Sequence, residues 1–261
     1  MANTAEYTYE DFIKQFYPKS GLDLHYYKQT QMQRRIESFM RTRSFNGYRE
    51  FLQALNSDAE LFDAFFKHLT INVSQFFRDA SQWDVLVKQV LPLIVQGKTR
   101  LKLWSAGCSS GQEPYSLAIM MREHFPSVSA SILATDIDKN ILKQAQAGVY
   151  RAGDFSSTPP NLLNKYFIAQ NNAYQVRPEI QQMVTFQAQN LLTDRFGNDF
   201  DFIACRNVVI YFTDDAKAML YQKFANALRS GGVFFTGSTE RCFGTSDYGL
   251  HSVFTFFYQK R

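Results

Sequence analysis

Apolar residues recur at helical spacing through the first third of the chain. Phe12, Ile13 and Phe16 lie three or four positions apart or side by side, and the same spacing returns in the stretches 51–55 and 61–69. Residues spaced in this way line one face of an α-helix, so each stretch predicts an amphipathic helix. The pattern predicts a small all-helical domain over residues 1–90, followed by a linker at 91–99.

From residue 100 onward, short apolar runs alternate with helical stretches. The runs are LKLWSA, SILATD, DFIACR, GVFFTG and VFTFFY. Such alternation is typical of an α/β fold, in which crossover helices join the mostly parallel strands of one sheet. Residues 100–261 are therefore predicted to form a doubly wound, mostly parallel sheet.

A different pattern interrupts this second domain at about 165–189. Strand-forming residues lie there on both sides of Asn171-Asn172, a pair that is typical of a turn. We expect a small antiparallel β appendage, which either covers a sheet edge or binds a partner.

Composition narrows the classes of function. An apolar content of 45% suits a globular core, and a net charge of +4 gives little support to nucleic-acid binding. No apolar run approaches the roughly 18 residues of a membrane span, and no signal peptide is recognisable, so a cytoplasmic location is expected. The spacing of the three cysteines predicts reduced thiols and no metal site.

The stretch LWSAGCSSGQEPYSLAI, residues 103–119, indicates a strand, a glycine loop and a helix. Such a loop lies at the carboxyl edge of a doubly wound sheet, where ligands bind. Gly107 and Gly111 do not meet the dinucleotide pattern G-x-G-x-x-G. Glu113 at the helix start disfavours a phosphate and favours a cationic ligand, such as the sulfonium and ammonium of S-adenosylmethionine. The alternative is that Glu113 only stabilises the helix start.

The second predicted strand ends at Asp136, where an acidic residue of Rossmann-like folds binds ribose hydroxyls. Asp138 is an alternative, but its place before a helical stretch suits an N-cap better. Both NAD and S-adenosylmethionine contain ribose, so this position does not separate the two.

A later strand leads into Arg206, Asn207 and Tyr211 at the same edge of the sheet. No [N/D]-P-P-[Y/F] motif follows, which argues against methylation of nucleic-acid bases. Cys205 could be a nucleophile, but a buried structural role is favoured. None of the four histidines falls in these strand ends, so a general base is hard to nominate. A carboxylate acceptor needs none, because it is already ionised and has only to be aligned in a dry site.

Five stretches of the chain follow one another in a recognisable order, namely NVSQFFRD (72–79), LWSAGCSSGQEPYSLAI (103–119), ATDID (134–138), NLL (190–192) and FDFIACRNVVIYF (200–212). Together they resemble the CheR family, the chemotaxis receptor methyltransferases of bacteria. The resemblance implies a Rossmann-like class I methyltransferase that moves a methyl group from S-adenosylmethionine to glutamates on the cytoplasmic helices of chemoreceptors. The products would be glutamyl methyl ester and S-adenosylhomocysteine.

The same resemblance implies roles for individual residues. Arg78 and Tyr211 would lie closest to the chemistry, Arg78 by orienting a carboxylate and Tyr211 by positioning the glutamate or the methyl group. Neither is expected to act as a base. Serine replaces the usual threonine at position 74, and GSTE at 237–240 replaces the more common G-H-S-E. The implied cofactor contacts are Asn72, Ser74, Arg78, Ala106, Gly107, Glu113, Asp136, Ile137, Asn190, Leu191, Arg206 and Asn207.

A basic stretch runs from Leu24 to Arg49. It contains one lysine, five arginines and a single acid, Glu37. Its helical spacing predicts that Arg34, Arg35 and Arg41 point outward. The resemblance supplies an acidic partner, the receptor cytoplasmic domain, although a solvated helix face is an equal alternative.

Two competing functions remain from the residues alone. One is a non-catalytic, CheR-like protein that binds S-adenosylmethionine or a receptor, and the other is a nucleic-acid methyltransferase. The favoured interpretation is the protein-glutamate methyltransferase, acting as a monomer without a metal, without nucleic acid and without membrane insertion.

Overall fold

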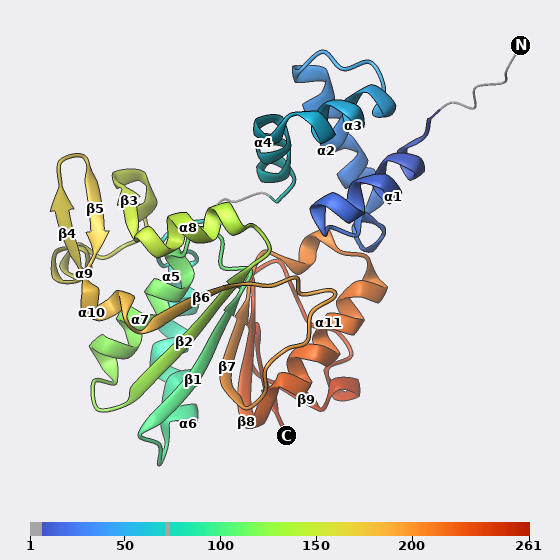
Figure 1. Ribbon diagram of the computed structural model, residues 1–261. Coiled ribbons are helices and arrows are strands. Elements are labelled where there is room, and N and C mark those ends of the chain that lie inside the picture. The colour runs from blue at the N-terminus through green and yellow to red at the C-terminus, as the bar shows by residue number, and fades with distance from the viewer. Residues whose placement is uncertain (1–6, 71–73) are drawn as a thin grey trace, which may run out of the picture. The chain divides into compact units, whose positions relative to one another are not determined.

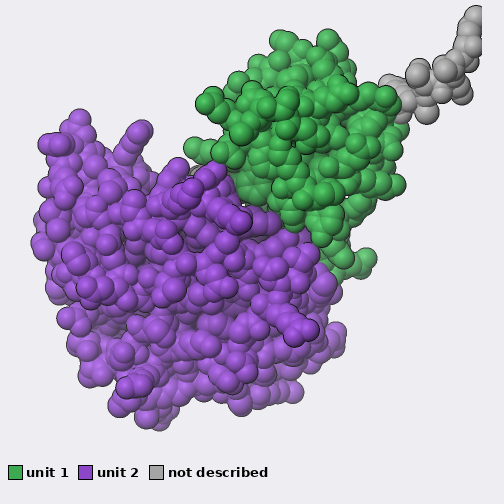
Figure 2. All heavy atoms as spheres, in the orientation of Figure 1, with its two compact units in different colours: residues 1–71, 211–217 green, residues 72–210, 218–261 purple. Residues whose placement is uncertain are grey.

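The computed structural model describes residues 7–70 and 74–261, which form two compact units (Figure 2). Residues 1–71 and 211–217 belong to the first unit, and residues 72–210 and 218–261 to the second. The division thus precedes the linker that was predicted at 91–99. The reason is that Trp83 and Leu86, which precede that linker, and Ile94, which lies within it, are all buried in the core of the second unit.

The first unit is helical, as predicted. Its first helix begins with a capping box, in which the Asp11 N–H donates to Thr8 Oγ1 (3.3 Å) and the Thr8 N–H donates to Asp11 Oδ2 (2.9 Å). Phe12, Phe51 and Phe65 meet in the core, with ring centroids 5.7 and 4.8 Å apart along that series. The helices are α1 (Tyr9–Ser20), η1 (Leu24–Tyr26), α2 (Gln29–Thr42), α3 (Tyr48–Ser57) and α4 (Ala59–Thr70).

The second unit is built on a seven-stranded sheet in the order β6-β2-β1-β7-β8-β10-β9 (Figure 1). The five strands from β6 to β8 are parallel, and β10 and β9 add two antiparallel strands. The predicted α/β architecture is confirmed. The strands are β1 (Arg100–Ala106), β2 (Ser129–Asp136), β6 (Val184–Ala188), β7 (Phe200–Cys205), β8 (Leu228–Thr236), β9 (Leu250–Phe254) and β10 (Phe257–Lys260).

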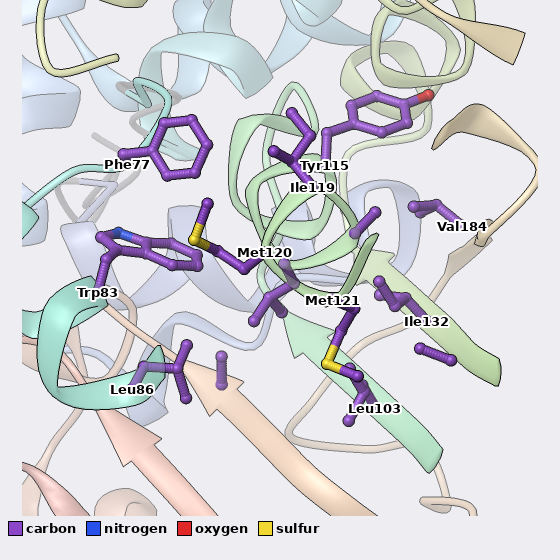
Figure 3. Packing of buried hydrophobic residues seen from close by; sticks show 14 of the residues in the cluster. Phe77, Trp83, Leu86, Leu103, Tyr115, Ile119, Met120, Met121, Ile132 and Val184 are labelled. Atoms are coloured by element: carbon purple, nitrogen blue, oxygen red, sulfur yellow. The ribbon is translucent and has the colours of Figure 1, made fainter. Parts of the chain in front are cut away.

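Successive side chains of β1 serve opposite faces of the sheet. Leu103 joins the hydrophobic cluster beneath α7 and the helices before β1, where Figure 3 shows Trp83 beside Met120. Trp104 packs on the other face against Phe224 of α11, with ring centroids 5.4 Å apart. The helices of this unit are α5 (Ala80–Val85), the π-helical turn η2 (Leu86–Val90), α6 (Leu91–Val95), α7 (Gln112–His124), α8 (Lys139–Ala147) and α11 (Asp214–Ala227), whose first turn is grouped with the first unit.

The predicted β appendage exists, but its bounds differ from 165–189. Residues 184–188 are not part of it, because they pair with β2 in parallel and form the edge strand β6 of the main sheet. Residues 149–151 supply the appendage's third strand instead. Asn171, with a φ of 53°, forms the predicted turn. The appendage comprises β3 (Val149–Arg151), η3 (Ala152–Phe155), α9 (Pro160–Tyr166), β4 (Phe167–Gln170), β5 (Ala173–Val176) and α10 (Pro178–Gln181), with strand order β3-β5-β4.

The prediction that VFTFFY forms one strand is wrong. It contains the end of β9 and the start of β10, which pair antiparallel around a tight turn. Phe256 takes a left-handed conformation there, with a φ of 70°. A continuous apolar run hid this reversal, because no glycine, proline or asparagine marks it. Short helical turns complete the chain at η4 (Val209–Tyr211) and η5 (Thr245–Tyr248).

An ion cluster at Asp201 ties β7 to its neighbours. This nearly buried carboxylate accepts from Lys98 Nζ (2.5 Å), from the Lys102 N–H (2.7 Å) and from Arg229 Nε. Burial alone would raise the pKa of Asp201, but these three partners outweigh it and lower the pKa below its usual range.

We expect Asp201→Asn to lower the free energy of unfolding by about 2 kcal/mol at neutral pH, since it removes the charge that its partners bind. A lowered folded-state pKa means that this stabilisation is present above the ordinary aspartate pKa of about 4 and is lost as the pH falls through the folded value. Urea unfolding at a series of pH values should show the difference between variant and natural chain shrinking below about pH 4.

Asp84→Asn serves as the matched control. Asp84 pairs with Lys88 at 3.3 Å on an exposed helix surface, where solvent screens the interaction. Its unfolding curve should follow that of the natural chain. Equal losses in the two variants would contradict the role given to Asp201.

Candidate active site

The glycine loop lies between the end of β1 and the start of α7, as predicted. The N–H groups of Gly107 and Cys108 donate to Thr135 O at 2.8 and 2.9 Å, which holds the loop against the end of β2. Gly107 has a φ of 76°, and a Cβ at this position would lie 2.5 Å from Val208 Cγ2. A side chain is therefore excluded by both the backbone conformation and the close approach. Ala106, the residue before the loop, is buried.

Glu113 lies in the first turn of α7, and both of its carboxylate oxygens have partners. Ser105 Oγ donates to Oε1 at 2.7 Å, and Arg206 Nη1 lies 3.3 Å from Oε2. Ser105 is on β1 and Arg206 follows β7. The carboxylate is thus held at the carboxyl edge of the sheet by two neighbouring strands.

Arg206 is the buried centre of an ion cluster. Its side chain is only 3% exposed, and besides Glu113 it binds Asp79 Oδ2 (2.9 Å) and Arg78 O (3.0 Å) through Nη2. Its guanidinium also lies 4.7 Å from the centroid of the Phe235 ring. Two carboxylates therefore share one guanidinium, and the cluster of Asp79, Glu113 and Arg206 has an excess of one negative charge.

The segment that supplies Arg78 is held in an unusual backbone conformation. Phe77 and Asp79, on either side of Arg78, have positive φ values of 52° and 62°. The Phe77 N–H donates to Ser116 Oγ (3.1 Å), and Trp83 Nε1 donates to Arg78 O (2.9 Å). Left-handed residues of this kind persist only where the surroundings enforce them, and they cluster at functional sites.

The residues before Arg78 in this segment differ in burial. Phe76 is fully buried and stacks on Phe155 of the appendage at 4.9 Å between ring centroids. Ser74 is partly exposed. Asn72, also predicted to contact a cofactor, lies outside the described residues.

Asp136 ends β2, and its side chain is almost fully buried. Oδ2 accepts from the Ser109 N–H (2.9 Å) and Oδ1 from the Asp138 N–H (3.0 Å). Burial raises the pKa of Asp136, while these backbone bonds oppose the shift. Asp138 is the N-cap of α8, accepting from the N–H groups of Asn140 (2.9 Å) and Ile141 (3.1 Å). The structure thus assigns the capping role to Asp138 and leaves Asp136 beside the glycine loop.

Asn190 and Leu191 follow β6 at the same edge of the sheet. The Gln189 N–H donates to Asp136 O (2.9 Å), which joins the ends of β6 and β2. Asn190 Oδ1 accepts from the Leu192 N–H at 3.0 Å, so this side chain shapes its own turn. Ile137 lies directly after Asp136 and before the Asp138 cap. The predicted residues on β1, β2 and β6 therefore converge on one edge.

Glu240 is a supporting residue whose role was not predicted from the sequence. It is 3% exposed, and it accepts from the N–H groups of Asn207 (2.5 Å), Gly237 (2.9 Å) and Ile210 (3.2 Å). Burial raises the pKa of Glu240, and these bonds oppose the shift. Asn207 has a φ of 59°, so Glu240 holds the loop after β7 in a left-handed turn. The signal available in the sequence was the GSTE motif at 237–240, whose last residue is Glu240.

Tyr211 is grouped with the first unit rather than with this cluster. Its carbonyl accepts from the Lys28 N–H at 2.9 Å, and Phe212 pairs with Tyr27 in an isolated bridge. The predicted proximity of Tyr211 to Arg78 therefore stays a prediction.

The basic face on α2 is only partly as predicted. Arg34 and Arg41 are exposed, but Arg35 is half-buried and donates through Nη2 to His68 O of α4. The expectation that all three point outward is wrong for Arg35, because this side chain links two helices of its own unit. Glu37 accepts from the Tyr48 hydroxyl at 2.7 Å, so the single acid of the stretch is bound within the unit.

The cysteines are buried thiols, and none is paired in a disulfide. Burial raises the pKa of Cys205 well above its usual range, which supports the structural role over that of a nucleophile. Within residues 7–70 and 74–261, no group of acidic, histidine or cysteine side chains forms a metal-binding set. In the same ranges, no helix has the length and apolar content to cross a membrane.

A Rossmann-like sheet with a glycine loop after β1 and a buried acid at the end of β2 is typical of proteins that bind a ribose-containing cofactor, a class that includes S-adenosylmethionine-dependent methyltransferases. Two family models place the chain further: "CheR methyltransferase, all-alpha domain" matches residues 8–70, and "CheR methyltransferase, SAM binding domain" matches residues 72–254. The chain belongs to the CheR methyltransferase family.

Similar proteins span nearly the whole chain. The chemotaxis protein methyltransferase of Listeria innocua is 46% identical over 92% of this chain and 92% of its own length. The corresponding protein of Listeria monocytogenes is 45% identical over the same shares. Chemotaxis protein methyltransferase 2 of Vibrio cholerae is 36% identical over 88% of this chain and 83% of its own length.

The charge of Glu113 can be tested by binding. Glu113→Gln should weaken S-adenosylhomocysteine about tenfold in calorimetry, since the amide cannot supply the negative charge that favours the ligand's ammonium. Glu123→Gln, in the last turn of the same helix, is the matched control, because Glu123 binds Lys165 and Tyr166 instead. Equal affinities of the Glu113 variant and the natural chain would contradict a ligand-binding role for this carboxylate.

Proposed function

We propose that the chain is a protein-glutamate O-methyltransferase that modifies the cytoplasmic helices of chemoreceptors. Membership of the CheR family supports methyl transfer, and the names of the relatives connect it with chemotaxis. The observation that carries the proposal is the ion cluster of Asp79, Glu113 and Arg206, whose excess negative charge lies at the end of α7 that faces the glycine loop.

The residues at this edge suit S-adenosylmethionine. The excess negative charge matches its ammonium and sulfonium groups, and a phosphate would be repelled. Both oxygens of Asp136 accept backbone N–H groups, and a carboxylate oxygen has capacity for a further donor such as a ribose hydroxyl. Glu113, Asp136 and the backbone of Gly107 would therefore hold the cofactor, which supplies an electrophilic methyl group when bound. Ser74, Asn190, Leu191 and Asn207 would complete the contacts.

The acceptor chemistry requires little of the chain's own residues. A glutamate carboxylate is already a nucleophile, so no group has to remove a proton. The positions of the two histidines in the second unit agree with an acceptor that needs no base. His124 lies at the end of α7 away from the glycine loop, and His251 lies on β9. Arg78, whose backbone is held by Trp83 and Arg206, would orient the carboxylate through a bidentate contact. Tyr211 would position it for in-line attack.

Substrate docking is assigned to the basic face of α2. Arg34 and Arg41 are exposed there, and with Arg35 they outnumber Glu37, the acid of the same helix, so the face has positive charge for an acidic receptor helix. Arg35 contributes to this face from a half-buried position, where its main contact is with α4.

The reaction itself is tested with tritiated S-adenosylmethionine and a purified receptor cytoplasmic domain. We expect label on the receptor that becomes volatile in base, because a methyl ester hydrolyses to methanol. Base-stable label would identify N- or C-methylation and would overturn the proposal. Binding of S-adenosylhomocysteine without any label would favour the non-catalytic alternative.

Docking is tested by the double variant Arg34→Ala, Arg41→Ala. We expect kcat/KM for the receptor to fall about tenfold at low salt, and the remaining activity to depend less on salt, since fewer charges steer the encounter. The affinity for S-adenosylhomocysteine should not change. The control is Arg100→Ala, Arg122→Ala, which removes the same charge from exposed positions elsewhere. Equal losses in both double variants would contradict a specific docking face.

A further inference from the structure

Phe243 is the most exposed large apolar residue in the described part of the chain. Its exposed fraction is 77%, whereas the next residue of this kind, Val149, is 50% exposed. Single exposed apolar residues are common on protein surfaces, so exposure alone indicates nothing. The surroundings of Phe243, however, indicate a functional role.

The loop on both sides of Phe243 is anchored. Cys242 is buried, and its N–H donates to the Tyr258 hydroxyl at 3.0 Å. Glu240 is buried and accepts from the backbone N–H groups of Asn207, Ile210 and Gly237. On the other side, Gly244 has a φ of 65° and its carbonyl accepts from the Asp247 N–H at 3.0 Å. The anchored backbone of this loop therefore holds the ring in an exposed position. Buried and exposed residues alternate from Glu240 to Phe243.

The same loop is continuous with the candidate active site. It follows the carboxyl end of β8, at the edge of the parallel strands where ligands bind. Glu240 holds the backbone of Asn207, and Ser238 Oγ lies 3.2 Å from Asp79 Oδ2. Asp79 belongs to the ion cluster with Glu113 and Arg206. Phe243 and the exposed Arg241 thus lie within a few residues of Ser238 and Glu240, which contact residues of the candidate site.

We infer that Arg241 and Phe243 form a docking contact for the acceptor helix. This inference rests on the proposed function, which supplies an acidic helix as substrate. The partner that fits has an apolar side chain three or four residues from the target glutamate, on the same face of its helix. Phe243 packs on that apolar side chain, and Arg241 meets a neighbouring acidic residue. The contact sets which glutamate of the helix reaches the site.

The test is steady-state methylation of a purified receptor cytoplasmic domain by the full chain. Phe243→Ala should raise the KM for the receptor about tenfold, the size expected for losing an aromatic anchor. The kcat at saturating receptor and the affinity for S-adenosylhomocysteine should stay unchanged. Phe243→Leu should restore part of the loss.

Leu93→Ala is the matched control, because Leu93 is 47% exposed on α6, which leads to the amino end of β1 at the opposite edge of the sheet. It should leave KM unchanged. An unchanged KM in Phe243→Ala, an equal rise in Leu93→Ala, or weaker S-adenosylhomocysteine binding in Phe243→Ala would each overturn the inference.

Two further outcomes are distinguishable. Sedimentation of the natural chain and Phe243→Ala reports self-association, and a dimer that only the natural chain forms would assign the ring to a second copy and overturn the inference. The natural chain in the methylation assay tests the proposed function separately. If it produces no base-labile label, both the proposed function and the inference fail, whereas normal label with an unchanged KM in the variant overturns the inference alone.

Discussion

The ion cluster around Arg206 is the interaction on which the rest of the site depends. A guanidinium that is 3% exposed joins three distant parts of the chain, namely the 78–79 segment, the start of α7 and the end of β7. Burying such a charge is costly unless it is paired and hydrogen-bonded. Arg206 therefore enforces an arrangement in which Asp79, Glu113 and the backbone of Arg78 meet at one edge of the sheet.

The balance of charge in this cluster changes how the negative charge of Glu113 is interpreted. In sequence, an acid at the start of a helix after a glycine loop indicated a cationic ligand. In the structure Glu113 is paired with Arg206, and a one-to-one pair would have cancelled that indication. Asp79 restores it, because two carboxylates share one guanidinium. The proposed preference for a cation thus rests on three residues from different parts of the chain.

Local patterns in the sequence predicted most of the fold. Apolar periodicity located the helices of the first unit and most strands of the sheet, and strand ends located Glu113 and Asp136. Errors arose where pairing over long distances decides the outcome. Residues 184–188 have a strand pattern in either sheet, and only the parallel pairing with β2 places them in the main one. The division between the units also escaped detection, because the helices at 80–95 have the same periodicity whichever core they join.

The site was predictable to the same extent. Residues at the ends of strands converge by topology, so the sequence order of the motifs was informative. Asp79 and Glu240 were missed because their roles depend on partners more than thirty positions away. The half-buried position of Arg35 was missed because helical spacing alone does not reveal the contact with His68.

The central claim is that this edge of the sheet binds the methyl donor through its negative charge. A crystal structure of the full chain with S-adenosylhomocysteine tests it most directly. The account predicts the ligand's ammonium beside Glu113 and its ribose hydroxyls on Asp136. A ligand bound elsewhere, or bound here with its carboxylate toward Glu113, would contradict the account.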